Sequence, residues 1–412
     1  MSGPDLFAVP RRIRRGAALT LVFTSVLVTG AATGSWTDGA DEKPEAPPAR
    51  AGTVSAAHEQ DVAKAAADAM AEGKSPTEAA ERAVSRSGDR WGAVYSEGEY
   101  AEFAQALDGE YTGVGLWARR AKDGRIEVAR VQRGGPAERA GIRAGDRLLT
   151  IDGQRVEDRP VTEVVALLRG GNSSRDKTVT EGDGGERGEG VGSATGTPVE
   201  LGLSRGAHRW TETLRRAVLS TDSVTVEQLG DGTSGAVLIK VAAFTKGSGE
   251  RVRSAVRAAP PGAGILLDLR GNSGGLVTEA TTAASAFLDG GLVATYDVRG
   301  EQRALHARPG GDTERPVVAL VDGGTMSAAE LLTGALQDRG RAVVVGSRTF
   351  GKGSVQMPSR LPGGSVAELT VGHYRTPSGH SVDGQGITPD LEAGSGSEKQ
   401  AETVLSGLGD AP

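Results

Sequence analysis

Residues 317–330 read VVALVDGGTMSAAE. The first five are aliphatic and mostly β-branched, and they end at a Gly-rich turn, which is typical of a strand buried in a parallel sheet. Residues 342–354, AVVVGSRTFGKGS, repeat this pattern. The two runs predict neighbouring strands, with Ser327 and Lys352 just past their carboxyl ends. An open α/β sheet binds ligands and places reacting groups at that edge.

The chain around these runs, from residue 209 to residue 395, alternates between strand and helix patterns. The stretch GILLDLR at residues 264–270 predicts another buried strand, which continues into the turn GNSGG at residues 271–275. Further strands are expected at residues 237–242 and 292–298, and helices at residues 249–258, 278–288 and 328–337. This alternation predicts an α/β core with helices packed on a sheet.

Ser327 and Lys352 suggest nucleophilic catalysis. A serine hydroxyl becomes a good nucleophile when a base takes its proton, and lysine is one of the bases that can do so. Ser327 is expected at a helix N-terminus, so the N–H of Ala328 is a candidate donor to an oxyanion, with a second donor expected from residues 271–275. Lys352 would have to be buried, because burial lowers the pKa of an amine.

The residues leave other interpretations open. Ser327 also fits an ordinary helix N-cap, and Lys352 fits a solvated loop lysine. His373 and His380 flank a turn near the end of the core, and either would supply the base of a Ser–His–Asp triad. No spacing of His, Asp and Glu indicates a metal site, and neither a metal nor another cofactor is expected.

Composition narrows the classes of function. The 412 residues predict two or three domains, and the net charge of −6 argues against a nucleic-acid partner, which requires a basic face. The chain has no cysteine. Disulfides, thiol catalysis, cysteine-ligated metals and a lipid-modified cysteine anchor are therefore excluded.

Residues 1–54 are expected to lie outside the globular fold, as a cytoplasmic basic stub, a transmembrane or signal segment and a linker. Four arginines at residues 11–15 precede an uncharged stretch at residues 16–36, which is long enough to span ~30 Å of hydrocarbon. The arginines predict that the stub stays in the cytoplasm and that the body of the protein faces outward. A cleaved signal peptide and a secreted protein are the alternative.

Residues 55–108 have the pattern of an N-terminal helical region. Ser75 followed by Pro76 predicts the N-cap and first turn of a helix. Four aromatic residues are expected to gather in a small core: Trp91, Tyr95, Tyr100 and Phe103.

Residues 109–208 resemble a PDZ domain. An alternating strand pattern at residues 126–131 precedes GPAERAGIRAGDRLLTIDG at residues 135–153, a one-turn helix between glycines, a Gly-Asp turn and a strand ending in Asp-Gly. Residues 161–168 resemble the groove helix, with an apolar face of Val161, Val164, Val165 and Leu168. Residues 170–198, rich in Gly, Ser, Thr and charge, predict a disordered insertion.

The PDZ resemblance implies capture of a peptide carboxyl terminus. Backbone N–H groups from Gly113, Val114, Gly115 and Leu116 would bind the terminal carboxylate, and the glycines allow its close approach. The peptide would then add as a strand beside Leu116, and Val161 on the groove helix would help to line an apolar pocket. A purely structural module is the alternative.

Several segments in one order resemble the carboxyl-terminal processing (tail-specific) proteases, serine peptidases with a Ser–Lys dyad. They are the PDZ stretch and residues 267–275, 327–330, 349–356, 374–379 and 386–390. The resemblance covers about residues 56–390 and implies that Ser327 is the nucleophile and Lys352 the base. It also implies that Gln356 orients the lysine, that Gly275 and Ala328 form the oxyanion hole, and that Asp338 supports the site.

We therefore expect an α/β protease core with an inserted PDZ-like β-module, an N-terminal helical region, an N-terminal transmembrane or signal helix, and a tail at residues 396–412. The expected function is a serine endopeptidase that recognises proteins or peptides by their carboxyl termini and uses no cofactor. The alternative is a non-catalytic PDZ protein that tethers protein tails at the membrane exterior.

Overall fold

The computed structural model describes residues 54–409, apart from Lys122, Asp158, Ser395 and residues 171–194, 231–234 and 299–300. The expected membrane or signal segment and most of the expected insertion at residues 170–198 fall outside these described residues. Within the described residues, no helix is both long enough and apolar enough to cross a bilayer.

The core is built on a six-stranded sheet with the order β10-β11-β12-β15-β16-β19. Its strands are β10 (Val224–Leu229), β11 (Ala236–Val241), β12 (Gly264–Asp268), β15 (Val317–Val321), β16 (Val343–Gly346) and β19 (Leu391–Glu392). Only β10 runs antiparallel to its neighbour. The predicted pairing of β15 with β16 is confirmed, so the loops that follow them leave the sheet at the same edge.

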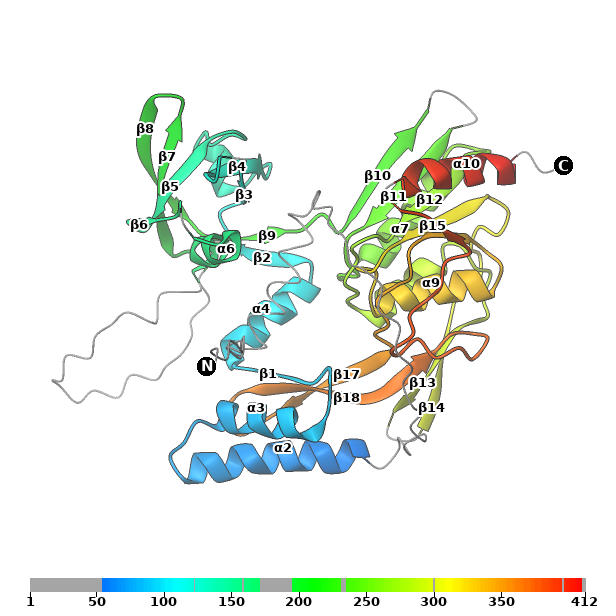
Figure 1. Ribbon diagram of the computed structural model, residues 1–412, viewed down its shortest axis with the longest axis horizontal. Coiled ribbons are helices and arrows are strands. Elements are labelled where there is room, and N and C mark those ends of the chain that lie inside the picture. Colours follow the sequence, from blue (N-terminus) through cyan, green and yellow to red (C-terminus); the bar gives the residue numbers. More distant parts are fainter. Residues whose placement is uncertain are drawn as a thin grey trace, which may run out of the picture.

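Helices cover both faces of this sheet (Figure 1). They are α7 (Ser248–Ala258), α8 (Val277–Ala284), α9 (Ala328–Asp338) and α10 (Ser397–Gly409). Because side chains alternate along a strand, Leu267 and Ala319 pack in the cluster with α7, α8 and α9, while Leu266 and Val318 pack with α10. Helix α10 lies where the sequence predicted only a tail, because Ala401 and Leu405 bury an apolar stripe on the sheet.

A second sheet lies beside the core, with the order β1-β18-β13-β14 and with β17 paired to β18. Its strands are β1 (Ala93–Tyr95), β13 (Leu292–Val298), β14 (Glu301–His306), β17 (Ser354–Arg360) and β18 (Val366–Arg375). Strand β17 begins two residues after Lys352. The loop that carries the lysine therefore leads directly into this second sheet.

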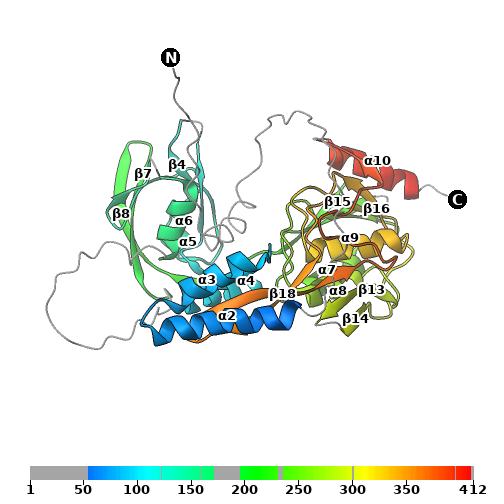
Figure 2. The ribbon, with the colours of Figure 1, turned by 60° about the horizontal axis from the view of Figure 1, so that its bottom comes forward.

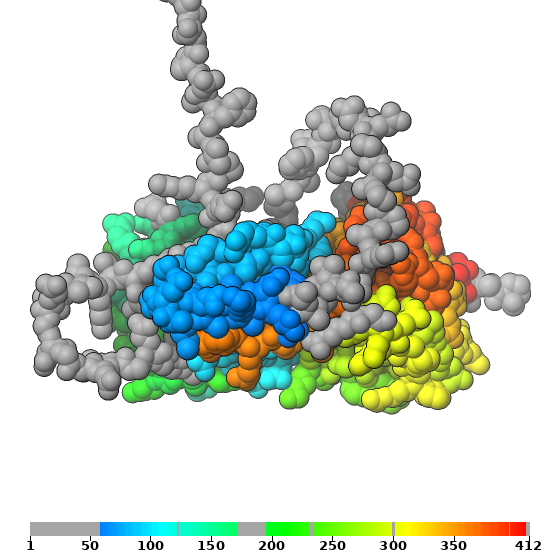
Figure 3. Space-filling view, turned by 90° about the horizontal axis from the view of Figure 1, so that it is seen from below, coloured from blue at the N-terminus to red at the C-terminus, as the bar shows by residue number. Residues whose placement is uncertain are grey.

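The N-terminal helices α2 (Val54–Ala71) and α3 (Pro76–Ser87) pack on this second sheet (Figures 2 and 3). Val62 and Val84 of the helices share a buried cluster with Ala367 and Leu369 of β18. The Ser75 side chain accepts a hydrogen bond from the Glu78 N–H, which confirms the predicted N-cap. The N-terminal region is thus packed on β18, the strand that pairs with β17 after Lys352.

The predicted aromatic core of this region is only partly correct. Tyr95, Tyr100 and Phe103 pack together on β1 and α4 (Glu97–Leu107), with ring centroids 5.4–6.2 Å apart. Trp91 does not join them, because its ring lies 5.7 Å from that of Phe350. A tertiary contact with a loop more than 250 residues away in the chain takes the place of the local one.

The PDZ-like module is a sheet with the order β3-β4-β5-β7-β8 and with β6 paired to β5. Its elements are β3 (Leu116–Arg120), β4 (Ile126–Val131), α5 (Pro136–Arg139), β5 (Arg147–Ile151), β6 (Gln154–Arg155), α6 (Val161–Arg169), β7 (Pro198–Arg205) and β8 (His208–Arg215). Strand β8 carries the module seven residues past the predicted boundary at residue 208. In α6, Leu167 is buried with Val164 and Leu168, whereas Val165 is only half-buried.

The module and the core lie on opposite sides of Figure 1. A two-stranded ribbon of β2 (Glu110–Gly113) and β9 (Ala217–Ser220) runs between them. Strand β2 enters the module and β9 leaves it. The chain therefore enters and leaves the PDZ-like module through paired strands.

Candidate active site

Ser327 lies at the turn between β15 and α9 in an unusual backbone conformation. Its φ is +55° and its ψ is −116°. Among the described residues, only one other non-glycine residue, Asp152, has a positive φ. Such backbone strain costs about 1–3 kcal/mol and persists where surrounding contacts enforce it, often at functional sites. A sharp strand-to-helix turn of this kind presents a nucleophilic serine at the edge of a sheet in the α/β-hydrolases.

The glycine turn at residues 271–275 lies directly against Ser327. A Cβ added at Gly274 would lie 2.9 Å from the Ser327 Cβ. The fully buried Asn272 fixes this approach, since its side chain accepts from the Gly274 N–H at 2.9 Å and its carbonyl oxygen accepts from the Met326 N–H at 2.8 Å. The turn and the serine loop are therefore one rigid unit.

In this unit Gly275 follows Gly274, and Ala328 follows the serine. The N–H groups of both residues make no hydrogen bond to another group in the described part of the chain. Ala328 begins α9, so its N–H also points out of the positive end of a helix. The two N–H groups are free to stabilise negative charge that develops beside Ser327.

Glu330 ties the serine loop to the lysine loop. Its buried carboxylate accepts hydrogen bonds from the Ser327 N–H at 2.9 Å and, across the sheet edge, from the Gly351 N–H at 2.7 Å and the Lys352 N–H at 2.8 Å. The Thr349 hydroxyl donates to the same carboxylate at 2.5 Å. Burial raises the pKa of Glu330, while these four hydrogen bonds oppose that rise.

The sequence reasoning did not single out Glu330. The signal was present, because a Ser followed three residues later by Glu is the spacing of a capping box, in which the Glu side chain binds the backbone N–H of the Ser. In this chain that carboxylate also reaches a second loop.

Tyr374 of β18 also joins the two loops and was also missed. Its hydroxyl lies 2.8 Å from the carbonyl oxygen of Ser327 and 3.0 Å from that of Lys352. The side chain is 2% exposed. Glu330 therefore holds the N–H groups of both residues, and Tyr374 approaches both of their carbonyl groups.

The Lys352 side chain enters a largely buried setting. Burial lowers the pKa of its amine, and the nearby carboxylates of Glu368, Asp89 and Glu330 oppose that shift. The amine nitrogen lies 5.3 Å from the centroid of the Trp91 ring. In the described part of the chain no hydrogen bond joins this nitrogen to the Ser327 hydroxyl.

Two predicted residues make no hydrogen bond to the side chains of this pair in the described part of the chain. The Gln356 amide nitrogen donates to the Ser354 hydroxyl at 2.7 Å and to the Thr370 hydroxyl at 3.3 Å. Asp338 is exposed at the far end of α9, about 16 Å along the helix from Ser327 at 1.5 Å per residue. There its carboxylate accepts from the Ser378 N–H at 2.8 Å, so it supports a distant turn.

The histidines also lie elsewhere. His373 is 3.6 Å from Asp383, and His380 contacts the carbonyl oxygen of Gly386. Neither is hydrogen-bonded to Ser327 among the described residues. Lys352 is tied to Ser327 through the carboxylate that accepts from both of their N–H groups, and this shared contact favours Lys352 over a histidine as the base. The described residues include no group of three or more His, Asp and Glu side chains placed to hold a metal ion.

The PDZ-like module presents a strand edge beside its groove helix. Strand β3 is the last strand of its sheet, and α6 packs near it. The loop before it passes through Gly113, the buried Val114 and Gly115, whose φ is +77°. Val161 at the start of α6 packs partly against the core of the module. The loop from Gly113 to Leu116 therefore leads into the edge strand, and Val161 begins the helix that packs near that strand.

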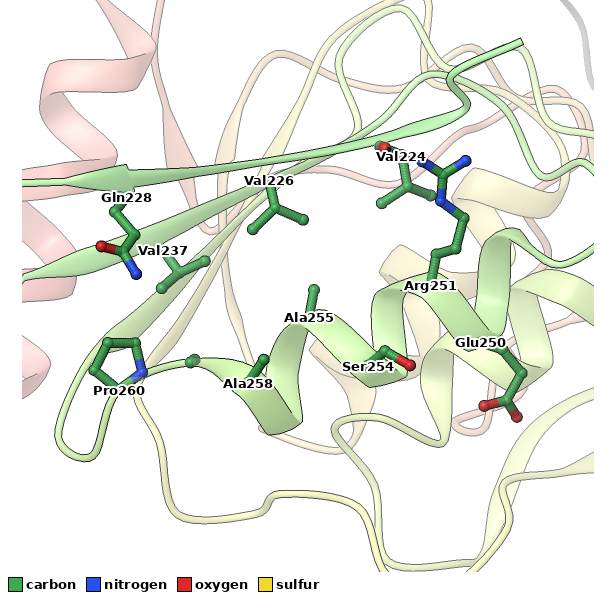
Figure 4. Close-up of a pocket in the computed structure, with 11 residues that line it drawn as sticks. Val224, Val226, Gln228, Val237, Glu250, Arg251, Ser254, Ala255, Ala258 and Pro260 are labelled. Atoms are coloured by element: carbon green, nitrogen blue, oxygen red, sulfur yellow. Dashed lines mark hydrogen bonds between the residues drawn. The ribbon is translucent and has the colours of Figure 1, made fainter. Parts of the chain in front are cut away.

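A separate groove of about 620 Å³ lies between β10 and α7 (Figure 4). Figure 4 shows Val226 and Ala255 facing each other across it, with Arg251 at one end. None of the predicted site residues lines this groove.

Comparisons with known proteins agree with this architecture. Residues 236–393 match the model of peptidase family S41, and residues 127–180 match that of the PDZ domain. The chain is 33% identical over 330 residues to the carboxyl-terminal-processing peptidase 3, chloroplastic, of Arabidopsis thaliana, covering 76% of this chain and 59% of that protein. It is 30% identical over 306 residues to the carboxy-terminal processing protease CtpA of Bacillus subtilis (strain 168), covering 73% and 60%.

The chain spans about three fifths of the length of these curated relatives. Among solved structures, a putative S41 protease from Bacteroides fragilis NCTC 9343 aligns over 81% of this chain and 90% of its own, with a TM-score of 0.51 and 16% identity. At 16% sequence identity, this similarity shows a shared fold and nothing about function.

Proposed function

We propose that this chain, which belongs to peptidase family S41 and carries a PDZ domain, is a serine endopeptidase that processes proteins from their carboxyl ends. The observation that carries the proposal is the arrangement at the sheet edge. Ser327 is held in a strained conformation, and one buried carboxylate, that of Glu330, fixes it to the loop of Lys352.

In the proposed reaction, the Lys352 amine takes the proton of the Ser327 hydroxyl. The Ser327 oxygen attacks the peptide carbonyl carbon, and the resulting oxyanion is stabilised by the N–H groups of Gly275 and Ala328. The tetrahedral intermediate collapses, the peptide C–N bond breaks, and the Lys352 ammonium protonates the departing amine. Water, deprotonated by the same lysine, then hydrolyses the acyl-enzyme and regenerates Ser327.

Oxyanion donors are worth about 2.7–4 kcal/mol each in comparable sites, and a positioned general base contributes about 10²–10⁴-fold. Gln356 has a supporting role in the proposal: through Thr370 it holds the strands that follow Lys352. Asp338 acts only on the stability of the turn that it contacts. No cofactor takes part.

We further propose that the PDZ domain supplies the substrate. A protein tail would add as a strand to the free edge of β3, with its carboxylate at the N–H groups of the loop from Gly113 to Leu116. The positive φ of Gly115 and the position of β3 at the edge of its sheet support this mode.

A substrate with a free tail should therefore be cleaved faster than the same substrate with an amidated tail. Removing the terminal charge loses charge-assisted hydrogen bonds worth about 1.5–3 kcal/mol, so kcat/KM should fall by roughly 10–150-fold. The measurement uses the full chain and two unstructured polypeptides that differ only at the terminus. Equal rates would contradict PDZ recognition of the carboxylate, and binding without cleavage would favour the tethering alternative.

We also propose that the catalytic body lies outside the cytoplasm, either anchored in the cell membrane or released by cleavage. The support is the arginine cluster followed by the uncharged stretch at residues 16–36. Protease added to intact cells should then reach the full chain, or the chain should appear in the medium, whereas a variant lacking residues 16–36 should stay inside. Retention of both forms in the cytosol would contradict the proposal.

A further inference from the structure

Trp91 of the N-terminal region lies at the candidate catalytic lysine. Its ring centroid is 5.3 Å from the Lys352 amine nitrogen and 5.7 Å from the Phe350 ring. The Arg90 guanidinium lies 4.6 Å from the same ring. Trp91 is outside residues 236–393, the part of the chain that matches the peptidase family model. The peptidase core alone therefore does not enclose its own candidate base.

The turn that carries Trp91 is fixed to the core. The Asp89 carboxylate accepts from the N–H groups of Trp91 at 3.1 Å and Gly92 at 2.9 Å. The same carboxylate accepts from the N–H and the hydroxyl of Thr370 on β18, each at 2.8 Å. Thr370 also receives a hydrogen bond from Gln356 at 3.3 Å. One carboxylate thus joins the turn that carries Trp91 to β18, which pairs with the strand that follows Lys352.

A lysine base requires a setting that keeps water away from its amine, because a hydrated amine holds its proton near neutral pH. A ring close to the amine excludes water, and it also attracts the ammonium form by a cation–π interaction of about 0.5–2 kcal/mol. The first effect favours the neutral amine and the second favours the charged one. Since burial is the largest influence on this group, we expect exclusion of water to dominate.

We propose that Trp91 is a positioning residue that covers and orients the amine of Lys352, so that the N-terminal region completes the active site. The inference rests on the proposed Ser–Lys function and extends it to a residue outside the peptidase core. Three carboxylates face the amine from different elements: Glu368 on β18, Asp89 in the tryptophan turn and Glu330 on α9. Arg90 is the nearby cation on the turn itself.

The test is the pH dependence of kcat/KM for a short chromogenic ester, measured on the full chain and on Trp91→Ala and Trp91→Phe. In Trp91→Ala, water reaches the amine and the acid limb moves up by about one pH unit, so activity at pH 7 falls about tenfold and recovers above pH 9. In Trp91→Phe, which retains a ring over the amine, the profile should stay within about half a unit of the wild type.

Trp210 offers a matched control. It lies on β8 of the PDZ domain and has a guanidinium, that of Arg205, 5.4 Å from its ring. Trp210→Ala should keep the wild-type pH profile with the ester. Melting temperatures of all variants separate a shifted profile from loss of folded protein.

Three results would overturn the inference. They are an unchanged profile in Trp91→Ala, an equal loss of activity at every pH in that variant, or a gain of activity that marks the ring as a latch. If wild type and Ser327→Ala hydrolyse the ester equally, the proposed function itself fails.

Discussion

Replacing Ser327 with alanine should abolish peptide hydrolysis and leave the fold intact. The contacts that hold this position use backbone atoms, since Glu330 binds its N–H and the Tyr374 hydroxyl approaches its carbonyl oxygen. Alanine keeps both contacts and loses only the hydroxyl group that is the proposed nucleophile. Loss of a nucleophile in serine peptidases lowers kcat by about 10⁴-fold or more, and the oxyanion donors account for the residual activity.

The measurement is cleavage of an unstructured protein by the full chain and by Ser327→Ala, with the melting temperature and the affinity for a free-tailed peptide as controls. The affinity should not change, because the PDZ groove lies in a separate module. A variant that still cleaves at more than about one hundredth of the wild-type rate would show that another group is the nucleophile.

Replacing Lys352 with methionine should reduce kcat by about 10²–10⁴-fold. Methionine keeps most of the apolar stem and the backbone N–H that Glu330 binds, and it removes the amine. Lys352→Arg should be equally inactive, because a guanidinium keeps its proton and cannot act as a base. A purely structural positive charge would instead be rescued by arginine.

The pH profile adds a second readout for Lys352. Burial lowers the pKa of the amine, and the neutral form is the active one, so wild-type kcat/KM should rise as pH increases through that lowered pKa. Lys399 of α10 is exposed and provides the control, with Lys399→Met expected to match the wild type. A Lys352→Met variant with the wild-type rate and profile would rule out the dyad.

The repeating elements of the core were predictable from the sequence. Short apolar runs ending in Gly located β12, β15 and β16, and the parallel pairing of the last two follows from the alternation of strands and helices. The PDZ-like module was predictable from the resemblance of residues 135–153 and 161–168 to that domain, in which the turn glycines are prominent. Helix α10 was not, because its apolar residues are few among charged and small ones, and only packing on the sheet reveals its face.

The site divides in the same way. Ser327, Lys352 and the glycine turn each directly follow an apolar run that predicts a strand. The sequence pattern was therefore enough to predict that they lie at one edge of the sheet. Glu330 also had a local signal, the capping-box spacing from Ser327, but that spacing does not predict its contact with the lysine loop. Trp91 and Tyr374 act on residues far away in the chain, and no spacing within their own segments predicts such a tertiary contact.

The most direct test of the Ser–Lys account is detection of the acyl-enzyme. The full chain is mixed with a short peptidyl ester, quenched in acid within seconds, digested with pepsin and analysed by mass spectrometry. The account predicts an acyl group on the fragment that contains Ser327, present in wild type and absent from Ser327→Ala and Lys352→Met. An adduct on another residue, or an adduct that persists in Ser327→Ala, would contradict it.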